Sequence, residues 1–509
     1  MTDLTTEQWR VIRFLNFKME CVAEQEELGI GLDYDKAVRH RDELLLAQEE
    51  KVTQLKEVMP KVPKITKKEK PKVTHKKDGT LSVQGEKWFR LLKDNKLPMN
   101  FNGVIEVVSS YEEPNPGSPH QVKAWLDSLG WKPTTWKYVR EADGSERKIP
   151  QVRKDGELCP SVLRLIKHEP RLEVLEGLTV IQHRLGVFQG FIDSAYQKNG
   201  PCGGCKDGVD WGGYECQFCS GTGKKSNWYV TAGIAGLTNT LRFKHKKPIA
   251  NLPKVGVPWG EKIRGCLIAH DDETLCGSDL VGIESSTRDH YIMPLDPDLV
   301  EESNKSNYDP HLTIAKMAGM ISEEDYTFFG DYKDGDIDVG RYKRLKDIRQ
   351  KAKTVNYSAM YGVGAAKLAR ETDMPVKEAK LLLDTFWQIN WAVKEVAKDT
   401  PKKTLPNGEI WLFNPVSNFW HSLRFERDAW STLNQSTGVF VFDTWVAYSR
   451  KEGEKVVLNY HDEVVIRTKD EKKTEENLTR AIDFTNKKVK LNVLIGVDTQ
   501  FGPNYAKIH

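Results

Sequence analysis

The segment KVVLNYHDEVVIRT, Lys455 to Thr468, contains two β-branched runs that predict the strands of a hairpin. A tight hairpin turn usually contains Asn-Gly or Asp-Gly, because these residues tolerate a positive φ. Here the turn falls instead at His461, Asp462 and Glu463. Three ionisable side chains in place of turn-forming residues indicate a functional role for this tip.

A second acidic position occurs in ETLCGSDLVGIESSTRDHY, where Asp279 follows an apolar stretch predicted to form a strand and a turn. A carboxylate at a strand end that continues into a helix is a common metal position, although a helix-capping Asp gives the same pattern. If Asp462 stands opposite Asp279, the two carboxylates can hold two divalent cations against phosphate oxygens.

The segment RQKAKTVNYSAMYGVG predicts a helix with an unusual face. Arg349, Lys353, Tyr357 and Tyr361 recur every four residues and therefore share that face. Like charges at this spacing destabilise a helix, so we expect an anion there. Two aromatic rings continue the row and suit a planar base. The basic and aromatic residues together favour a nucleoside triphosphate as the ligand. Taken alone, an amphipathic helix with a basic rim has the same pattern.

These motifs resemble those of family-A DNA polymerases, the bacterial DNA polymerase I group, and they occur in the family's order. The matching motifs are Asp279 with Glu284, Asp309 with His311 in YDPHLTIAKMAG, Arg349 to Gly362, and His461-Asp462-Glu463. AEQEELGIGLD resembles the entry to the thumb, TLRFKHKKPIANLP the template-primer loop, and LNQSTG the Gln motif. GPNYAKIH resembles the tail of podovirus-type phage enzymes, so the resemblance covers essentially the whole chain.

The resemblance implies an α+β, right-hand polymerase fold with a helical thumb and fingers and an antiparallel β-sheet palm. It implies a thumb at 1–200 with a basic insertion at about 60–100, and a zinc-binding insertion at 201–224. The palm would occupy 225–300 and 401–509, and the fingers 301–400. The expected activity is template-directed addition of deoxynucleotides to a primer 3′-hydroxyl by two-metal-ion phosphoryl transfer, in the replication of a phage genome.

The family's mechanism assigns a role to each matching residue. Asp279 and Asp462, with the main-chain carbonyl of Leu280, would hold two Mg²⁺ ions beside Glu463. The nucleotide-binding set would be Arg349, Lys353 and His311 at the phosphates, Tyr357 and Tyr361 near the base, and Glu284 against a 2′-hydroxyl. Lys353 is also the candidate proton donor to pyrophosphate. Arg242, Gln435 and His461 would contact the DNA.

Two positions depart from the family pattern. Ser431 stands where the family has Asn, four residues before Gln435, and Leu241 replaces the glycine of a Thr-Gly-Arg motif. Neither departure touches the metal site.

Four of the eight cysteines, Cys202, Cys205, Cys216 and Cys219, form two CxxC pairs. In a reducing compartment this spacing predicts one closed tetrahedral Zn²⁺ site with a structural role, rather than disulfides. Four unligated buried cysteines are the alternative.

The charge of the whole chain says little about partners, because 76 Lys and Arg residues face 73 Asp and Glu residues. PKVPKITKKEKPKVTHKK, Pro60 to Lys77, carries eight lysines against one Glu and is predicted to be an exposed basic loop. It is either a solvated linker or a DNA contact. Podovirus-type relatives carry an insertion here that recruits a processivity factor, which is a candidate partner beside primer-template DNA and dNTPs.

The chain begins almost at the expected thumb, so we expect no exonuclease domain in it, and proofreading would require a separate exonuclease subunit. No leader and no uncharged apolar run of about 18 residues is present. We therefore expect a soluble, cytoplasmic protein, in the host cytoplasm if phage-encoded, with no membrane partner.

Three other functions fit part of the sequence. A phosphohydrolase would use His461-Asp462 as metal ligands but needs further histidines and leaves the helix at Arg349 unexplained. A non-catalytic zinc-containing nucleic-acid-binding module explains the cysteines and lysines but not the paired aspartates. A single-subunit RNA polymerase-like nucleotidyltransferase shares the palm, and Glu284 argues against it.

Overall fold

The computed structural model describes residues 4–141, 143, 145–154, 156–202, 204–217, 219–270, 272–332 and 338–508. The chain forms two compact units, of which unit 1 comprises Met1–Val38 with Val187–His509 and unit 2 comprises Arg39–Gly186. The first 38 residues thus group with the C-terminal part of the chain. The assignment of thumb, palm and fingers to the expected ranges stays a prediction.

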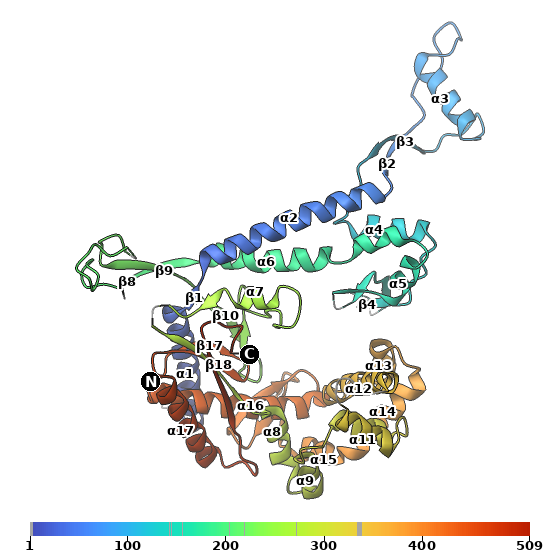
Figure 1. The fold of residues 1–509 in the computed structure, drawn as a ribbon. Helices are drawn as coiled ribbons and strands as arrows, with labels where there is room; N and C mark the ends of the chain where they lie inside the picture. The colour runs from blue at the N-terminus through green and yellow to red at the C-terminus, as the bar shows by residue number, and fades with distance from the viewer. Residues whose placement is uncertain are drawn as a thin grey trace. The chain divides into compact units, whose positions relative to one another are not determined.

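The centre of unit 1 is an antiparallel sheet of four strands in the order β17-β18-β13-β19. The strands are β17 (Val456–Tyr460), β18 (Glu463–Thr468), β13 (Thr274–Leu280) and β19 (Val497–Gly502). Helices α16 (Ala429–Lys451) and α17 (Glu471–Val489) contribute Trp445 and Ile482 to the core that contains Val464 and Ile466. The N-terminal helix α1 (Thr6–Leu28) packs against β17, as Figure 1 shows.

The predicted hairpin at Lys455 to Thr468 is confirmed. Tyr460 pairs with Glu463, so the loop consists of His461 and Asp462, and His461 has a φ of 64°. A histidine therefore occupies the left-handed region that a tight hairpin turn usually gives to Gly or Asn.

A second sheet of unit 1 has the strand order β12-β1-β9-β8. Its strands are β12 (Leu267–Ile268), β1 (Ile30–Leu32), β9 (Lys224–Val230) and β8 (Tyr196–Pro201). The cysteine segment connects β8 to β9, which form an antiparallel ribbon. A short hairpin of β10 (Ile234–Leu237) and β11 (Phe243–His245) and the helix α7 (Gly260–Arg264) follow β9.

Helices dominate the middle of unit 1, which Figure 1 shows in yellow to orange. They are α8 (Ile283–Ile292), α9 (Pro297–Ser303), α10 (Pro310–Met317), α11 (Glu323–Asp331), α12 (Val339–Met360), α13 (Ala365–Thr372), α14 (Val376–Ile389) and α15 (Trp391–Asp399). Val355 of α12 and Phe386 of α14 lie in one buried cluster, which holds α12 in place. A three-stranded sheet of β14 (Lys402–Thr404), β15 (Ile410–Asn414) and β16 (Phe419–Leu423) precedes α16.

Unit 2 contains most of the long helix α2, whose first residues belong to unit 1, together with shorter helices and small two-stranded sheets. Its elements are α2 (Tyr34–Val58), β2 (Val62–Lys68), α3 (Val83–Asp94), β3 (Ile105–Glu112), α4 (Pro119–Ser128), β4 (Trp136–Arg140), β5 (Glu146–Pro150), β6 (Arg153–Lys154), β7 (Glu157–Leu158), α5 (Pro160–Ile166) and the start of α6 (Leu178–Ser194). Its core contains Leu55, Trp125, Leu126 and Leu172.

The prediction that Pro60 to Lys77 lacks regular structure is wrong for its first half. β2 pairs along its length with β3, and Lys61, Lys64 and Lys67 form ion pairs with glutamates that border or belong to β3. The sequence did not show this, because the acidic partner strand lies some forty residues further along the chain. The predicted exposure is correct, since these three lysine side chains remain largely in solvent.

Within the described part of the chain, no helix has both the length and the apolar character needed to cross a lipid bilayer.

Candidate active site

A row of three carboxylates crosses the central sheet. Asp279, the penultimate residue of β13, pairs with Glu463 of β18 on one side and with Asp498 of β19 on the other. Residues directly opposite in antiparallel strands place their side chains on the same face, and like charges in that position repel each other. Asp279 and Asp498 are exposed, whereas Glu463 is buried. Such a row costs stability unless a cation or a proton neutralises part of it.

The hairpin tip adds a fourth carboxylate to this end of the sheet. The main-chain amide of Leu280 donates to the main-chain carbonyl of Asp462 at 3.1 Å. Asp462 therefore lies one residue beyond the position opposite Asp279, and its side chain is exposed. Carboxylate oxygens are the ligands that Mg²⁺ prefers, so the donor set fits the predicted magnesium site.

The C-terminal tail contacts the same row, which the sequence did not predict. Tyr505 is buried and its hydroxyl donates to Glu463 Oε2 at 3.4 Å. Burial raises the pKa of Tyr505, so the hydroxyl stays protonated and supports the Glu463 carboxylate as a hydrogen-bond donor.

Three aromatic rings gather at the hairpin tip. The ring of His461 lies 5.3 Å from that of His245 and 4.3 Å from that of Tyr460. Burial, reinforced by the positive charge of Arg242, lowers the pKa of His461 to about 4. Burial also lowers the pKa of His245 to about 4, so both imidazoles are neutral at pH 7. Of the predicted DNA contacts, Arg242 and His461 are thus close enough to interact electrostatically.

The face of α12 meets the Asp-x-His element. Arg349 Nε donates to Asp309 Oδ2 at 2.5 Å. The other oxygen of Asp309 caps α10 by accepting from the amides of His311 and Leu312, both at 2.9 Å. Asp309 therefore orients the Arg349 guanidinium and fixes the helix start that carries His311.

His311 is held in one orientation by a residue that the sequence analysis did not identify. Asn356 Nδ2 donates to His311 Nδ1 at 2.7 Å, which leaves the ring proton on Nε2. Burial is the main cause that lowers the pKa of His311 to about 4. At pH 7 a neutral ring therefore offers an N–H donor rather than a positive charge.

A cavity of about 190 Å³ adjoins this helix face. Its walls include five of the predicted site residues, Glu284, His311, Tyr357, Tyr361 and Gln435. Phe386 and Trp430 add apolar surface. Gln435 Nε2 donates to the Tyr361 hydroxyl at 3.1 Å. Tyr357 is 55% exposed, so its ring is free to stack on a planar ligand.

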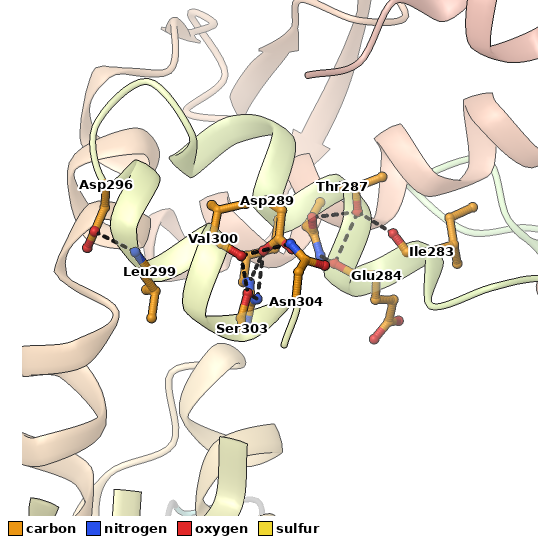
Figure 2. Close-up of polar contacts among 11 residues, drawn as sticks. Ile283, Glu284, Thr287, Asp289, Asp296, Leu299, Val300, Ser303 and Asn304 are labelled. Atoms are coloured by element: carbon orange, nitrogen blue, oxygen red, sulfur yellow. Dashed lines mark hydrogen bonds and ion pairs between the residues drawn. The ribbon is translucent and has the colours of Figure 1, made fainter. Parts of the chain in front are cut away.

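Lys353 lies beside the cavity rather than in its wall, with Nζ 5.9 Å from the Tyr357 ring centre. The carboxylate row and the cavity are connected directly by the chain, because Glu284 follows Asp279 by five residues. Five residues span at most about 18 Å, which bounds the distance between Asp279 and Glu284 within unit 1. The helix α8 that begins there is drawn in Figure 2, where Thr287 contacts the main chain of Ile283 and Glu284.

The cysteine quartet has the geometry of a metal site. Its four sulfur atoms all lie within 4.8 Å of one another. The Cys202 and Cys216 sulfurs are 3.8 Å apart, and those of Cys205 and Cys219 are 3.5 Å apart. A tetrahedral ion with sulfur ligands at about 2.3 Å requires sulfur–sulfur distances of about 3.8 Å, so the cluster fits one Zn²⁺.

The loop around the cysteines depends on a glycine. Gly208 has a φ of 92°, and a Cβ atom there would lie 2.0 Å from the carbonyl oxygen of Gly221. The main-chain carbonyl of Gly208 accepts a hydrogen bond from the amide of Cys216 at 2.8 Å. Only glycine at position 208 allows the main chain to approach Gly221 this closely. This approach brings the two cysteine pairs together.

A family model described as DNA polymerase family A matches residues 224–507. DNA polymerase I of Aquifex aeolicus (strain VF5) is 26% identical over 262 residues, which cover 48% of this chain and 41% of that protein. DNA polymerase I of Geobacillus stearothermophilus is 24% identical over 287 residues, covering 53% of this chain and 30% of that protein. These matches span less than half the length of either relative.

Among solved structures, the chain resembles the POL domain of Pol1 from M. smegmatis, a complex with DNA primer-template and dNTP. The TM-score is 0.58 at 15% sequence identity, and the match covers 96% of this chain and 70% of that chain. At this identity the likeness concerns the fold. The expected α+β polymerase fold is confirmed.

Proposed function

Because this chain belongs to DNA polymerase family A, we propose that it is a DNA-directed DNA polymerase that extends a primer 3′-hydroxyl with deoxynucleotides. The observation that carries the proposal is the position of Asp279 and Asp462 at one end of the sheet. Glu284 follows Asp279 by five residues and lies in the wall of an aromatic cavity. A nucleotidyl transfer site needs acidic metal ligands next to a base-stacking pocket, and this arrangement supports both.

Asp279, Asp462 and the main-chain carbonyl of Leu280 would hold two Mg²⁺ ions, which would activate the primer hydroxyl and clamp the triphosphate. The protein's own part is to orient the nucleotide. Arg349, fixed by Asp309, and Lys353 would contact the phosphates.

The remaining cavity residues would select the nucleotide and its primer. The neutral His311 would donate from Nε2 to a phosphate oxygen, and Tyr357 would stack on the base. Glu284 would exclude a 2′-hydroxyl. Gln435 lines the cavity and is held by its hydrogen bond to the Tyr361 hydroxyl, which supports its proposed contact with the DNA minor groove. Arg242 and His461 would contact the primer.

We also propose that the cysteine quartet holds one structural Zn²⁺ that organises the β8–β9 loop. The GPNYAKIH tail resembles podovirus-type enzymes, and on that basis we propose that the substrate in the cell is a phage genome. The tail's contact with Glu463 through Tyr505 gives that segment a part in the site. A processivity factor and a separate exonuclease subunit stay predictions.

A primer-extension assay tests the proposal. The purified chain is given Mg²⁺, a labelled primer on a DNA template, and single dNTPs or rNTPs. We expect extension by the complementary dNTP alone, and no extension in excess EDTA. No extension with any dNTP would overturn the proposal, and equal use of rNTPs would favour an RNA polymerase-like enzyme.

A further inference from the structure

We infer that Asn434 is a positioning residue for sugar discrimination, because it anchors the helix turn that carries Glu284. This inference rests on the proposed function. Asn434 lies on α16, 150 positions away in sequence, and its Nδ2 donates to the main-chain carbonyl of Glu284 at 3.0 Å. Its Oδ1 accepts from the hydroxyl of Thr287 at 2.8 Å. One amide therefore contacts both ends of the first turn of α8.

The chemistry fixes the orientation of the Asn434 amide. A main-chain carbonyl only accepts hydrogen bonds, so the NH₂ group must face Glu284. The amide oxygen is then left for the Thr287 hydroxyl, which has a single proton to donate. Two carbonyls within α8 compete for that proton, Ile283 at 2.9 Å and Glu284 at 3.2 Å, and Figure 2 shows both contacts. Asn434 is the nearest of the three acceptors.

Ile283 anchors the first turn of α8 in the core, but the turn has no side-chain cap. Its N-cap residue is Gly282, with a φ of 54° and no side-chain hydrogen bond to the helix. Thr287 is completely buried, so water cannot replace the contact with Asn434. Asn434 and Glu284 both line the cavity, and the Glu284 side chain is exposed. The main chain that Asn434 holds therefore sets the point from which the Glu284 side chain extends into the cavity wall.

Exclusion of a single extra oxygen atom by a side chain requires that the side chain cannot move aside. If the anchor is removed, the turn can shift and Glu284 can yield to a 2′-hydroxyl. The effect should appear in the ratio of dNTP to rNTP incorporation. It should depend on the Glu284 side chain and should therefore disappear when that side chain is removed. A residue with a purely structural role would lower stability without changing that ratio.

The test measures single-turnover incorporation of dATP and ATP opposite template T by the wild type and by Asn434→Leu, Glu284→Ala and the double variant. Asn434→Leu should lower discrimination about tenfold, because it removes both hydrogen bonds of the amide. In the double variant discrimination should equal that of Glu284→Ala, because both changes act on one wall. Thr287→Val removes only the hydroxyl and should shift the ratio in the same direction, which provides a second test if Asn434→Leu misfolds.

The control is Asn486→Leu on α17, where the same side chain bridges to the backbone of Ile495 by bonds of 2.9 and 3.1 Å. It should leave discrimination as in the wild type. Wild-type discrimination in both Asn434→Leu and Thr287→Val, or additive effects in the double variant, would overturn the inference alone. Failure of the wild type to incorporate dATP would overturn the proposed function and the inference with it.

Discussion

The amide of Leu280 donates a hydrogen bond of 3.1 Å to the carbonyl of Asp462, and this bond joins the end of β13 to the tip of the β17–β18 hairpin. Asp279 precedes Leu280 directly, so the bond also fixes two carboxylates that lie far apart in the sequence. The pairing of Asp279 with Glu463 and Asp498 adds two more acidic groups to the same end of the sheet. The proposed cation site rests on this concentration of negative charge rather than on any single aspartate.

Replacement of Lys353 should impair nucleotide use. Lys353→Ala removes a positive charge beside the Tyr357 ring, and we expect kcat/KM for dNTP to fall by about a hundredfold or more. Single-turnover incorporation checks this. Lys351→Ala is the matched control, because Lys351 lies on the same helix and pairs with Asp347 at 2.8 Å. Equal losses in the two variants would show that the charge of α12 as a whole, and not the position of Lys353, matters.

Stability should fall as the pH drops from about 6.5 to about 4. Burial lowers the pKa values of His245, His311 and His461 from 6.5 to about 4, so in this window the unfolded state binds more protons than the folded state. The loss begins near the unfolded pKa and is complete near the folded one. Denaturant unfolding at a series of pH values measures it.

His245→Phe should make this dependence less steep, because the variant keeps an aromatic ring beside Tyr460 and removes one titrating group. The control is His120→Phe, which replaces an exposed histidine. Its free energy of unfolding should depend on pH as that of the wild type does. Identical pH slopes in all three proteins would contradict the prediction.

Protein purified without chelator should contain one equivalent of zinc. Cys202→Ser combined with Cys216→Ser should abolish zinc binding and make the β8–β9 loop sensitive to proteases, because the two sulfurs lie 3.8 Å apart in the cluster. Cys159→Ser is the control, since Cys159 is a buried cysteine of unit 2 outside the cluster. Less than half an equivalent of zinc in the wild type, or full zinc in the double variant, would rule out the site.

The lysines between Pro60 and Lys77 should differ in their contribution to DNA binding. Lys61, Lys64 and Lys67 already face glutamates, so their replacement by Gln should change the salt dependence of binding little. Lys68, Lys72, Lys76 and Lys77 form no ion pair with a described residue, and each one that contacts a phosphate should contribute about 0.9 to the slope of log K against log salt. Equal slopes for the two sets of variants would argue against DNA contact by this segment.

The sequence predicted those structural elements whose pattern lies within one short segment. The hairpin at His461 and the helix at Arg349 follow from periodicity within one segment, and both are present with the expected residues. The cysteine cluster follows from spacing alone, because CxxC pairs leave few ways to bring four sulfurs together.

The sequence did not reveal contacts between distant segments. The pairing of β2 with β3 depends on an acidic strand that no pattern near Pro60 predicts. Asn356, Asn434 and Tyr505 contact residues on other elements through one or two hydrogen bonds each. Asparagine and tyrosine occur in many other settings, so only the folded geometry distinguishes these three.

The most direct test of the account is single-turnover primer extension by Asp279→Asn and Asp462→Asn, with DNA binding measured on the same preparations. Each variant removes one negative charge and keeps the side-chain volume, so the fold and DNA binding should persist. Arg480→Gln, on α17 at a surface ion pair with Glu452 at the end of α16, controls for the loss of a charge elsewhere in unit 1. We predict that both aspartate variants bind primer-template DNA, are at least as stable as the wild type and incorporate no detectable nucleotide, while the control extends normally. Substantial extension by either aspartate variant at saturating Mg²⁺ would contradict the proposed active site.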